Sequence, residues 1–482
     1  MLGVLADGVL TLEEVHRFPN GPVEEGGTLR WNLEGKLLPE VRRGIAACAE
    51  KVGAPITSVG VDSWGVDFGL LGADGRLIEK PYHYRDARTE GMMDEAFRRM
   101  PKRELYERTG IQFMPINSVY QLLSVRLRND PALARARTLV FIADLVSRDL
   151  CGRTFAEYTL ASTSQMMDMR SGRWSEELLA ALDLPLALLP DVIAPGAPVG
   201  TLDSAVVKGD GCDGAAVVAV GSHDTASAVV AAPAEAEDWA YISSGTWSLM
   251  GVEVPRPLIN DRTFAHGFTN EGGVQNTIRL LKNISGLWLV QECRRQWARE
   301  GRDFSYADLT EMAREARPFA ARLAPDDPEF LAPGDMPARI NRHLMRDGQA
   351  ALEDPGALVR ALLENLAFCY RETLDNIEDI IGRRISVVHI VGGGAHNELL
   401  SQFAANAMNR GVVTGPFEAT SIGNVLRQAR ALGRLDSLSD VRAVVRRSFP
   451  TKRFSPDGAA AWDDAYGKWR AQRGRDSAKE ES

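Results

Sequence analysis

The sequence predicts an α/β protein of two domains with a ligand-binding cleft between them. Short apolar runs bounded by glycine-rich turns alternate with longer amphipathic stretches, as strands and helices do. This mixture occurs in two successive blocks, separated by the acidic segment PAEAEDW at 233–239. Two such blocks are typical of α/β domains that enclose a cleft. We therefore expect a first domain over 1–234, a second domain over 235–447, and a charged tail with little pattern over 448–482.

The first domain is expected to open with a β meander. VLTLEEVHRF and TLRWN read as strands, and the turn-rich NGPVEEGG separates them. An amphipathic helix is predicted near 33–51. ITSVGVDSWGVDFGLLGADGRLI then predicts two strands hinged at Ser63-Trp64-Gly65, with a turn at 73–75. From about 88 to 183 the pattern is mainly helical.

Further strands follow this helical part. The proline-rich stretch at 184–200 ends it, and AAVVAV at 215–220 is a short, fully apolar strand. WAYISSGTWSLMGVEV at 239–254 predicts strand, tight turn and strand, and ISVVHIVGGGAHNELLSQFAANAM at 385–408 predicts strand, triple glycine and helix. Between these lies a long helix with an i, i+4 stripe that we expect in the core. The stripe consists of Leu358, Leu362, Leu366, Cys369, Thr373 and Ile377.

Composition excludes several classes of function. The chain of 482 residues is 45% hydrophobic and carries a net charge of -9, which leaves no basic surface for nucleic-acid phosphates. Its five cysteines are odd in number and never form a C-x-x-C pair, so neither a disulfide framework nor a zinc site is indicated. No apolar run reaches membrane-spanning length, and MLGVLADGVLTLEE lacks the basic region of a signal peptide. We expect a cytoplasmic protein without nucleic-acid or membrane partners.

The stretch GSHDTASAVVAA at 221–232 sets two polar residues among small apolar ones. Burying an isolated carboxylate costs several kcal/mol unless the group is paired or hydrogen-bonded. Asp224 is therefore interpreted either as the N-cap of a following helix or as an acid that faces a cleft, and the two are compatible. His223 is either a satisfied core histidine or a cleft residue. No catalytic triad or H-E-x-x-H metal pattern accompanies it.

Three other stretches have both a functional and a plain interpretation. ISSGTWSLMG at 242–251 could present successive backbone amides to a phosphate, or it could be an ordinary hairpin. Gly392-Gly393-Gly394 lacks dinucleotide and Walker spacing, so it is a strand-to-helix turn or a place where a flat nucleoside approaches closely. Trp64, with Asp67 and Phe68, is either core or part of a sugar pocket.

Taken in order, these stretches resemble the FGGY family of carbohydrate kinases. The likeness runs from about residue 9 to about residue 455, and the ordered series is specific although each motif is weak alone. The matching pieces are GVDSWGVDFGLL, YRDART, GIQFMPINSVYQL, GSHDTASAV, SSGTWSLMG, TNEGG, LKNISGLWL, HIVGGGAHN and EATSIGN. The resemblance implies two ribonuclease H-like domains of the actin-type ATPase fold that flank a catalytic cleft, with ATP mainly on the second domain.

The resemblance also implies roles for individual residues. Asp224 matches the general base that deprotonates the attacking sugar hydroxyl, as phosphoryl transfer requires. The positions that match sugar contacts are Gly65, His223, Asp224, Thr225 and Asn283. The positions that match ATP contacts are Thr246 at the phosphates, Gln291, and Gly393 beside the adenosine. Mg²⁺ is implied as a cofactor, with no metal ligand assigned.

The matching stretches are most similar to those of family members that act on L-rhamnulose. The implied reaction converts ATP and L-rhamnulose to ADP and L-rhamnulose 1-phosphate in L-rhamnose catabolism. Another deoxyketose, such as L-fuculose, is the alternative substrate, because discrimination between epimers depends on a few hydrogen bonds. The implied partners are thus a small sugar and ATP.

One departure from the family pattern concerns the start of the first domain. The family begins with a strand and an Asp-Leu-Gly-x-x-Ser loop that organises Mg²⁺ and the phosphates, and nothing like it precedes MLGVLADGV. We therefore expect the first domain to lack its first strand and phosphate loop. Either Met1 is an internal methionine taken for the start, which the intact remaining motifs favour, or the chain is a catalytically impaired sugar-binding relic.

Overall fold

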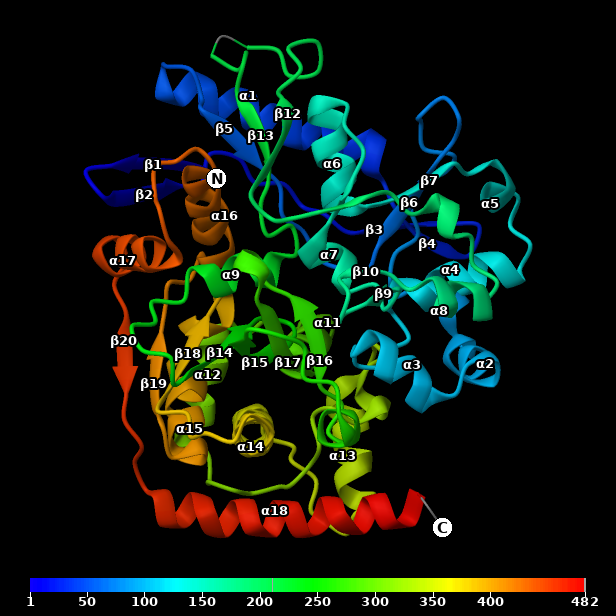
Figure 1. Cartoon of the computed structure of the whole chain (residues 1–482). Helices are drawn as coiled ribbons and strands as arrows, with labels where there is room; N and C mark the ends of the chain where they lie inside the picture. Colours follow the sequence, from blue (N-terminus) through cyan, green and yellow to red (C-terminus); the bar gives the residue numbers. More distant parts are fainter. Residues whose placement is uncertain (210, 481–482) are drawn as a thin grey trace. The chain divides into compact units, whose positions relative to one another are not determined.

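The computed structural model describes residues 1–209 and 211–480. Contacts between Cα atoms divide the chain into two compact units (Figure 1). Unit 1 comprises Met1–Ala231, Glu253–Leu281 and Ala419–Ser448, and unit 2 comprises Ala232–Val252, Lys282–Glu418 and Phe449–Ser482. The chain first leaves unit 1 close to the acidic segment singled out in the sequence, and it then returns to unit 1 twice. The units are therefore not simple consecutive halves of the chain.

The sheet that carries the candidate site in unit 1 has the strand order β12-β13-β5. β13 (Ala216–Ala219) pairs in parallel with β5 (Ser58–Gly60) and antiparallel with β12 (Ala197–Thr201). The predicted strand at 215–220 is thus confirmed. Because parallel strands end at the same edge of a sheet, the residues after β5 and after β13 are brought together.

Most of the remaining strands of unit 1 form short two-stranded ladders. They are β1 (Leu2–Ala6) with β2 (Val9–Glu13), β3 (Pro22–Glu25) with β4 (Thr28–Trp31), β6 (Phe68–Leu71) with β7 (Thr138–Phe141), β8 (Ala156–Glu157) with β11 (Val192–Ile193), and β9 (Met167–Asp168) with β10 (Arg173–Trp174). β16 (Thr269–Gly272) pairs with β17 (Ile278–Ile284), and both are strands of a seven-stranded sheet. The predicted meander is therefore two separate hairpins. The hinge at Ser63 is confirmed, but the strands on its two sides belong to different sheets.

Twelve α-helices of the described chain belong to unit 1. They are α1 (Leu38–Val52), α2 (Met92–Arg99), α3 (Lys102–Thr109), α4 (Ser118–Leu127), α5 (Pro131–Arg135), α6 (Ile142–Cys151), α7 (Tyr158–Ser162), α8 (Glu176–Ala181), α9 (Asp224–Val230), α10 (Asp261–Ala265), α16 (Ala419–Ala431) and α17 (Leu438–Ser448). The predicted helix near 33–51 is confirmed as α1, preceded by a single wider turn over Leu33–Leu37. Within the part predicted to be mainly helical, β7 is a strand that the pattern missed.

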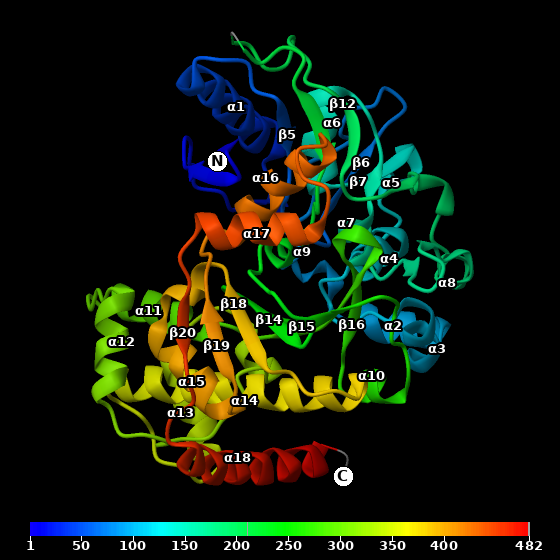
Figure 2. The ribbon, with the colours of Figure 1, turned by 60° about the vertical axis from the view of Figure 1, so that its left-hand side comes forward.

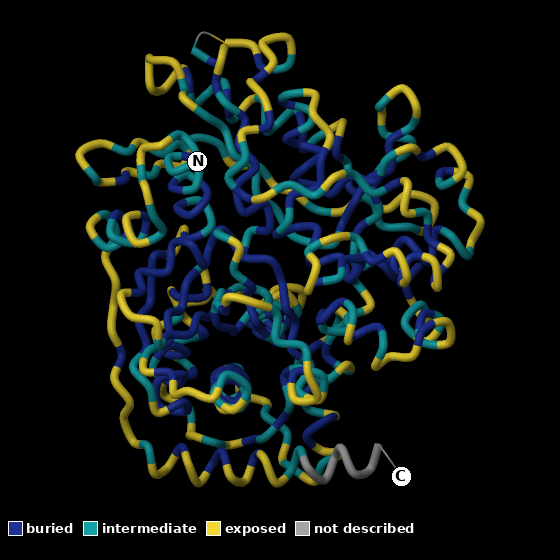
Figure 3. The backbone as a smooth tube through the Cα atoms, viewed as in Figure 1, coloured by how far each residue is buried: buried dark blue, intermediate teal, exposed yellow. Residues whose placement is uncertain are grey.

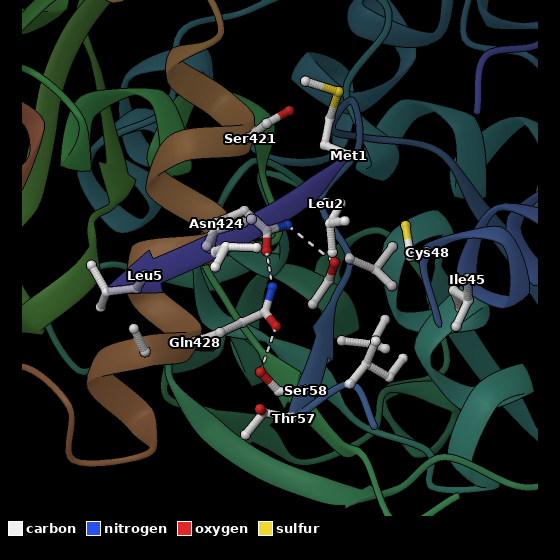
Figure 4. Close-up of a pocket in the computed structure, with 18 of the residues that line it drawn as sticks. Met1, Leu2, Leu5, Ile45, Cys48, Thr57, Ser58, Ser421, Asn424 and Gln428 are labelled. Atoms are coloured by element: carbon white, nitrogen blue, oxygen red, sulfur yellow. Dashed lines mark hydrogen bonds between the residues drawn. The ribbon is translucent and has the colours of Figure 1, made fainter. Parts of the chain in front are cut away.

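A groove of about 820 Å³ lies within unit 1 and is lined by β1, α1, β5 and α16 (Figure 4). On its α16 side, Asn424 Nδ2 donates to the carbonyl oxygen of Gly60 at 3.2 Å, and the side-chain amide of Gln428 is hydrogen-bonded to Ser58 Oγ at 2.8 Å. Side chains of α16 therefore satisfy polar groups along β5, the edge strand of its sheet. The groove extends as far as Asp62, the residue before the hinge.

The largest sheet supplies the core of unit 2. Its unit 2 strands run in the order β15-β14-β18-β19-β20, and β14, β18 and β19 are mutually parallel. Their bounds are β14 (Trp239–Ser244), β15 (Ser248–Val254), β18 (Val387–Val391), β19 (Gly411–Thr414) and β20 (Lys452–Phe454). The predicted strand, turn and strand over 239–254 is confirmed as the β14–β15 hairpin. Figure 2 shows β18, β19 and β20 side by side, with α14 below them in that view.

Among the residues that the structure describes, six α-helices belong to unit 2. They are α11 (Trp288–Arg299), α12 (Tyr306–Glu315), α13 (Met336–Arg346), α14 (Pro355–Ile381), α15 (Glu398–Met408) and α18 (Ala459–Glu480). The α14 helix starts where the Asp354 side chain accepts a hydrogen bond from Ala357 N and ends at Gly382 in the left-handed region. All six residues of its predicted stripe are buried, which confirms the core assignment.

The segment after 447, expected as a tail with little pattern, contributes to the core of unit 2. β20 pairs with β19, and α18 buries Trp462, Ala465, Tyr466 and Trp469 on one face. Figure 3 shows this one-sided burial along α18. Trp469 is 1% exposed, and its indole N–H donates to the Leu323 carbonyl oxygen at 2.9 Å. Among the described residues, no helix combines the length and apolar character needed to cross a membrane.

Candidate active site

Two stretches singled out in the sequence meet at the carboxyl edge of the unit 1 sheet. Ser63, at the hinge after β5, donates from its N–H to the Ser222 carbonyl oxygen at 2.9 Å. Its own carbonyl oxygen accepts from Asp224 N, also at 2.9 Å. Ser63 and His223 thus form an isolated parallel bridge beyond the end of the β5–β13 ladder. The structure therefore holds the backbone of His223 and Asp224 against the hinge.

Glu157 and Thr159 hold the same backbone from the other side. Glu157 Oε2 accepts from Ser222 N at 3.1 Å, and Thr159 Oγ1 accepts from His223 N at 3.1 Å while donating to Glu157 at 2.5 Å. Both side chains are buried. Burial raises the pKa of Glu157 to about 7, although the hydrogen bonds that it accepts oppose the shift. Sequence reasoning missed this pair, because nothing in AEYTL indicates a contact so distant in the chain.

Asp224 is the first residue of α9 and lies where the solvent can reach it. The N-cap position belongs to His223, whose side chain makes no capping bond, so the predicted N-cap at Asp224 is wrong by one residue. Asp224 Oδ1 instead accepts from Thr225 N at 2.6 Å and from Thr225 Oγ1 at 3.2 Å. Its side chain is 45% exposed. The acid that looked buried from its neighbours is therefore an accessible carboxylate with a fixed orientation.

Small residues along α9 let this helix pack closely. α9 packs against α16, and a Cβ atom on Gly423 of α16 would overlap the Ser227 carbonyl oxygen. Only glycine at 423 permits this approach. The close packing buries all of α9 except Asp224.

The β16–β17 hairpin places two charged groups against the His223 ring. Glu271 and Arg279 are directly opposed across the ladder. Arg279 Nη2 lies 3.0 Å from Glu271 Oε2 and 3.1 Å from His223 Nδ1, and Glu271 Oε2 lies 3.3 Å from the same Nδ1. On its other side, His223 Nε2 lies 3.5 Å from Asp224 Oδ1. Burial alone would raise the pKa of Glu271, but Arg279 and His223 hold it below its ordinary value.

The hinge itself has an unusual backbone. Val66 has φ of 68°, a region that β-branched residues rarely occupy. Its carbonyl oxygen accepts from Ser118 Oγ at 2.5 Å, and its N–H donates to Thr163 Oγ1 at 3.3 Å. A Cβ atom on Gly65 would lie 3.0 Å from Thr163 Oγ1, so glycine suits this position. Helix α4 and the turn after α7 therefore hold Val66, and with it Gly65, next to the bridge between Ser63 and His223.

Trp64 and Asp67 belong to a hydrogen-bonded cluster in the interior. Asp67 is 1% exposed and accepts from Trp31 Nε1 at 2.6 Å, from Trp64 Nε1 at 3.0 Å and from Gln121 Nε2 at 3.1 Å. The two indole rings pack with centroids 4.3 Å apart. Burial raises the pKa of Asp67 to about 6 despite these donors. The plain interpretation of Trp64 as a packing residue is the one that the contacts support.

A second carboxylate, that of Asp62 at the end of the groove, is an electrostatic neighbour of Asp224. Asp62 is partly buried, and Asn424 Nδ2 donates to its Oδ2. Burial raises the pKa of Asp62 to about 6, and the negative charge of Asp224 adds to the rise, whereas Asn424 lowers it. The like-charge effect shows that the two carboxylates are electrostatic neighbours. Sequence reasoning passed over Asp62, although GVDSWG was among the motifs.

Unit 2 brings together Thr246 and Gln291. Thr246 Oγ1 donates to Gln291 Oε1 at 3.2 Å. The first amides of α11 donate to the turn, from Leu287 N to Gly245 O and from Trp288 N to Thr246 O. The Gly245 amide donates to Trp247 O at 2.8 Å, so this amide is occupied within the turn. Of the two interpretations of this stretch, the ordinary hairpin accounts for the Gly245 amide, and the phosphate cradle stays a prediction.

The triple glycine lies next to this turn in unit 2. β14 and β18 are parallel neighbours, with Ser243 opposite Val391, so the turn after β14 and the glycines after β18 share one edge of the sheet. A Cβ atom on Gly394 would overlap Ser244 Oγ, whereas one on Gly393 would meet nothing within 4 Å. Gly394 therefore serves close packing, and Gly393 leaves an open surface. Asn283 lies on β17, in the part assigned to unit 2.

Comparisons with known proteins agree with this arrangement. Family models for the FGGY family of carbohydrate kinases match residues 23–231 with the N-terminal domain and residues 240–432 with the C-terminal domain. The chain is 44% identical to the rhamnulokinase of Bacteroides thetaiotaomicron over 97% of this chain and 95% of that protein. It is 38% identical to the rhamnulokinase of Enterococcus faecalis over 93% and 90%, respectively.

Solved structures show the same fold at low sequence identity. A ligand-bound xylulose kinase from Lactobacillus acidophilus superposes with a TM-score of 0.79 at 16% identity, covering 95% of this chain and 92% of that one. Plasmodium falciparum glycerol kinase with ADP superposes with a TM-score of 0.75 at 15% identity, covering 96% and 92%. The fold is thus the two-domain, ribonuclease H-like fold of the actin-type ATPases. The chain belongs to the FGGY family of carbohydrate kinases.

Proposed function

We propose that this chain phosphorylates L-rhamnulose with ATP to give L-rhamnulose 1-phosphate. The observation that carries the proposal is the accessible, oriented carboxylate of Asp224, whose backbone is held by Ser63 on one side and by Glu157 and Thr159 on the other. The choice of ketose rests on the similarity to the two rhamnulokinases. A deoxyketose kinase needs such a base, because the sugar hydroxyl must lose its proton as the bond to phosphorus forms.

In this proposal Asp224 accepts the proton of the attacking hydroxyl. The two hydrogen bonds from Thr225 occupy Oδ1 and fix the plane of the carboxylate. Positioning of this kind contributes to catalysis because reacting groups need not search for their alignment. His223, Thr225, Gly65 and Asn283 are proposed sugar contacts, carried over from the family resemblance. Of these, all but Asn283 lie in unit 1 with the base.

ATP is proposed to bind to unit 2 through Thr246, Gln291 and Gly393. Thr246 and Gln291 are already hydrogen-bonded to each other, so a phosphate oxygen would compete for the Thr246 hydroxyl. A Cβ atom placed on Gly393 would meet nothing within 4 Å, and this open surface supports the proposed position of Gly393 beside the flat adenosine. These groups are neutral, so they can orient a nucleotide without a fixed cation.

Mg²⁺ is the cofactor that this reaction class uses, and Asp62 fits it. Its carboxylate supplies the hard oxygens that Mg²⁺ prefers, and one carboxylate suffices when phosphates complete the coordination. Burial, and to a smaller extent the negative charge of Asp224, raise the pKa of Asp62, and a cation would relieve both costs. When bound, Mg²⁺ would neutralise charge on the phosphates. Asp62 is therefore the proposed ligand on this chain, and Asp224 stays free to accept the proton.

The expected cytoplasmic location also enters the proposal. All five cysteines are free thiols, which supports this location because such thiols persist in a reducing compartment.

A coupled assay of ADP release by the purified chain tests the proposed function. With ATP and Mg²⁺, we expect turnover of L-rhamnulose well above that of L-fuculose and above the rate without sugar. Faster turnover of L-fuculose would assign the chain to the other ketose. Calorimetric binding of L-rhamnulose without any ADP release would instead support the sugar-binding relic. An Asp94→Asn chain, altered at an exposed aspartate of α2, is the matched control for later variants.

A further inference from the structure

The His223 ring has different kinds of partner at its two nitrogens. Nδ1 faces Arg279 Nη2 at 3.1 Å and Glu271 Oε2 at 3.3 Å, and Nε2 faces Asp224 Oδ1 at 3.5 Å. A guanidinium can only donate hydrogen bonds, and an ionised carboxylate can only accept them. If Arg279 donates to Nδ1, the ring proton lies on Nε2, whereas if Nδ1 donates to Glu271, the proton lies on Nδ1. In the first case Nε2 can donate a hydrogen bond to a ligand, and in the second it can only accept one.

The contacts favour a proton on Nε2. Arg279 Nη2 carries two hydrogens, and its distances of 3.0 Å to Glu271 Oε2 and 3.1 Å to His223 Nδ1 allow it to serve both acceptors. A hydrogen on Nδ1 would point at this donor. At the other end, the acceptor Asp224 matches an N–H at Nε2. Arg279 is itself fixed, since its Nε donates to the Gly272 carbonyl oxygen at 2.9 Å and its side chain is 1% exposed.

We propose that Arg279, held by Glu271, fixes His223 as the Nε2–H tautomer and so presents a hydrogen-bond donor beside Asp224. Arg279 and Glu271 are thus positioning residues that act through His223. Nothing in the family resemblance assigned a role to either residue. The tautomer itself does not depend on what the chain phosphorylates, but its catalytic consequence rests on the proposed function.

The consequence concerns the hydroxyl from which Asp224 removes a proton. As that proton leaves, negative charge develops on the hydroxyl oxygen, and a donor at Nε2 can stabilise it. An unprotonated Nε2 would instead compete with Asp224 for the same proton. The pair on the hairpin therefore determines whether His223 assists or opposes the base. The charged groups in contact with His223 are Asp224, Glu271 and Arg279. Asp62 interacts with His223 through its charge.

Nitrogen-15 NMR of the histidine rings tests the tautomer directly. The chain has seven histidines, and a His223→Gln chain identifies the signals of this ring. At about pH 8, where an ordinary imidazole is neutral, we expect a protonated Nε2 and an unprotonated Nδ1. A proton on Nδ1, or on both nitrogens, would overturn the proposal. The measurement itself is made on the folded wild-type chain, and the His223→Gln chain serves only to assign its signals.

Three variants separate this role from simple structural support. In Arg279→Met, Glu271 becomes the sole charged neighbour of Nδ1, and we expect the proton to move to Nδ1. Arg279→Lys keeps a donor and should keep the Nε2–H form. In the double variant E271M/R279M both charges are gone, so no carboxylate draws the proton to Nδ1 and no buried charge is left alone. Glu40→Gln, which alters the partner of His16, is the control and should leave the His223 signals unchanged.

Kinetics then connect the tautomer to the reaction. With ATP and L-rhamnulose, we expect Arg279→Met to lower kcat on the order of 100-fold, the loss typical of one donor to a developing oxyanion. E271M/R279M should retain more activity than Arg279→Met, whereas a merely structural pair predicts that the double variant is at least as impaired. A double variant slower than the single one would overturn the inference. Absence of wild-type turnover would instead contradict the proposed function and leave the NMR result standing.

Discussion

The two candidate sites of this chain are built from different kinds of side chain. In unit 1, Asp224 and His223 are surrounded by charged groups on separate elements, among them Glu271 and Arg279. In unit 2, the predicted contacts are the hydroxyl of Thr246, the side-chain amide of Gln291 and the backbone of Gly393. Thr246 is hydrogen-bonded to Gln291 on α11. Charged groups held in fixed positions suit proton movement, and neutral groups suit reversible binding of a nucleotide. The contrast supports our proposal that proton transfer belongs to unit 1 and ATP binding to unit 2.

The largest effect is expected from removing the base in unit 1. Asp224→Asn keeps the size of the side chain and an oxygen that can accept from Thr225, but it cannot take a proton. We expect kcat to fall about 10²–10⁴-fold, the usual contribution of a general base. Binding of L-rhamnulose, measured by calorimetry, should change little.

The matched control for this prediction is Asp94→Asn, which should have wild-type kcat. If Asp224→Asn and Asp94→Asn turned over at similar rates, proton transfer would not belong to this part of unit 1. The contrast between the two units would then be broken.

Gly394 and Gly393 of unit 2 are expected to differ in how much stability they lose when replaced by alanine. In Gly394→Ala the new methyl group overlaps Ser244 Oγ, so we expect a loss of stability of about 1–3 kcal/mol, as for other overpacked sites. In Gly393→Ala the methyl group meets nothing within 4 Å, so stability should stay within about 0.5 kcal/mol. Denaturant unfolding measures both.

A rise in KM for ATP in Gly393→Ala, without a loss of stability, would sharpen the assignment of this surface to the nucleotide. If KM for L-rhamnulose rose in its place, Gly393 would belong to a sugar site and the contrast between the units would be wrong.

The pH dependence of stability should depend on Glu157 in unit 1. Its pKa is raised from 4.5 to about 7 in the folded chain, so the fold binds this proton more tightly than the unfolded chain does. The stability that results is present below about pH 4.5 and is lost as the pH rises toward 7. We expect Glu157→Gln to reduce this loss by about 1–3 kcal/mol between pH 5 and 7.5.

Urea unfolding at the two pH values measures this effect, and Glu50→Gln, at an exposed glutamate of α1, is the control. If the free energy of unfolding of Glu157→Gln changed between the two pH values as much as that of the wild-type chain, this carboxylate would not titrate in that range. Because Glu157 also holds the backbone before His223, kcat should fall at both pH values.

The smallest effect is expected from the hydroxyl of unit 2. Thr246→Val keeps the shape of the side chain and removes the hydrogen bond to Gln291. A neutral hydrogen bond is worth about 0.5–1.5 kcal/mol, so KM for ATP should rise roughly 2- to 10-fold. Kinetics at varied ATP and fixed ketose test this, and KM for L-rhamnulose serves as the internal control. A change in KM for L-rhamnulose alone would contradict the assignment of Thr246 to the ATP site.

Much of the local structure could be predicted from the sequence because its signals are short-range. The helix stripe from Leu358 to Ile377, the hairpin over 239–254 and the hinge at Ser63 all follow from periodicity and turn residues. β7 was missed because TLVF is a four-residue apolar run between helices, too short to distinguish from a helix end. α18 was missed although Trp462, Ala465, Tyr466 and Trp469 have helical spacing.

The candidate site could be predicted only in part, for a physical reason. Asp224 and His223 lie in one conspicuous motif, and the resemblance gave them roles. Glu157 and Arg279 contact that motif from 56 to 65 residues away, and no local pattern reports such contacts. The error of one residue at the α9 N-cap has a similar origin, because the backbone bond from Asp224 to Ser63 helps to set where the helix begins.

Phosphorus NMR of the reaction product, made by the wild-type chain and by Asp224→Asn, tests the central claim most directly. With ATP, Mg²⁺ and L-rhamnulose, the wild-type chain should yield a phosphate ester coupled to the hydrogens on C1, and Asp224→Asn should yield almost none in the same time. A phosphate on another carbon, or equal yields from the two chains, would contradict the assignment of the base and the ketose to unit 1.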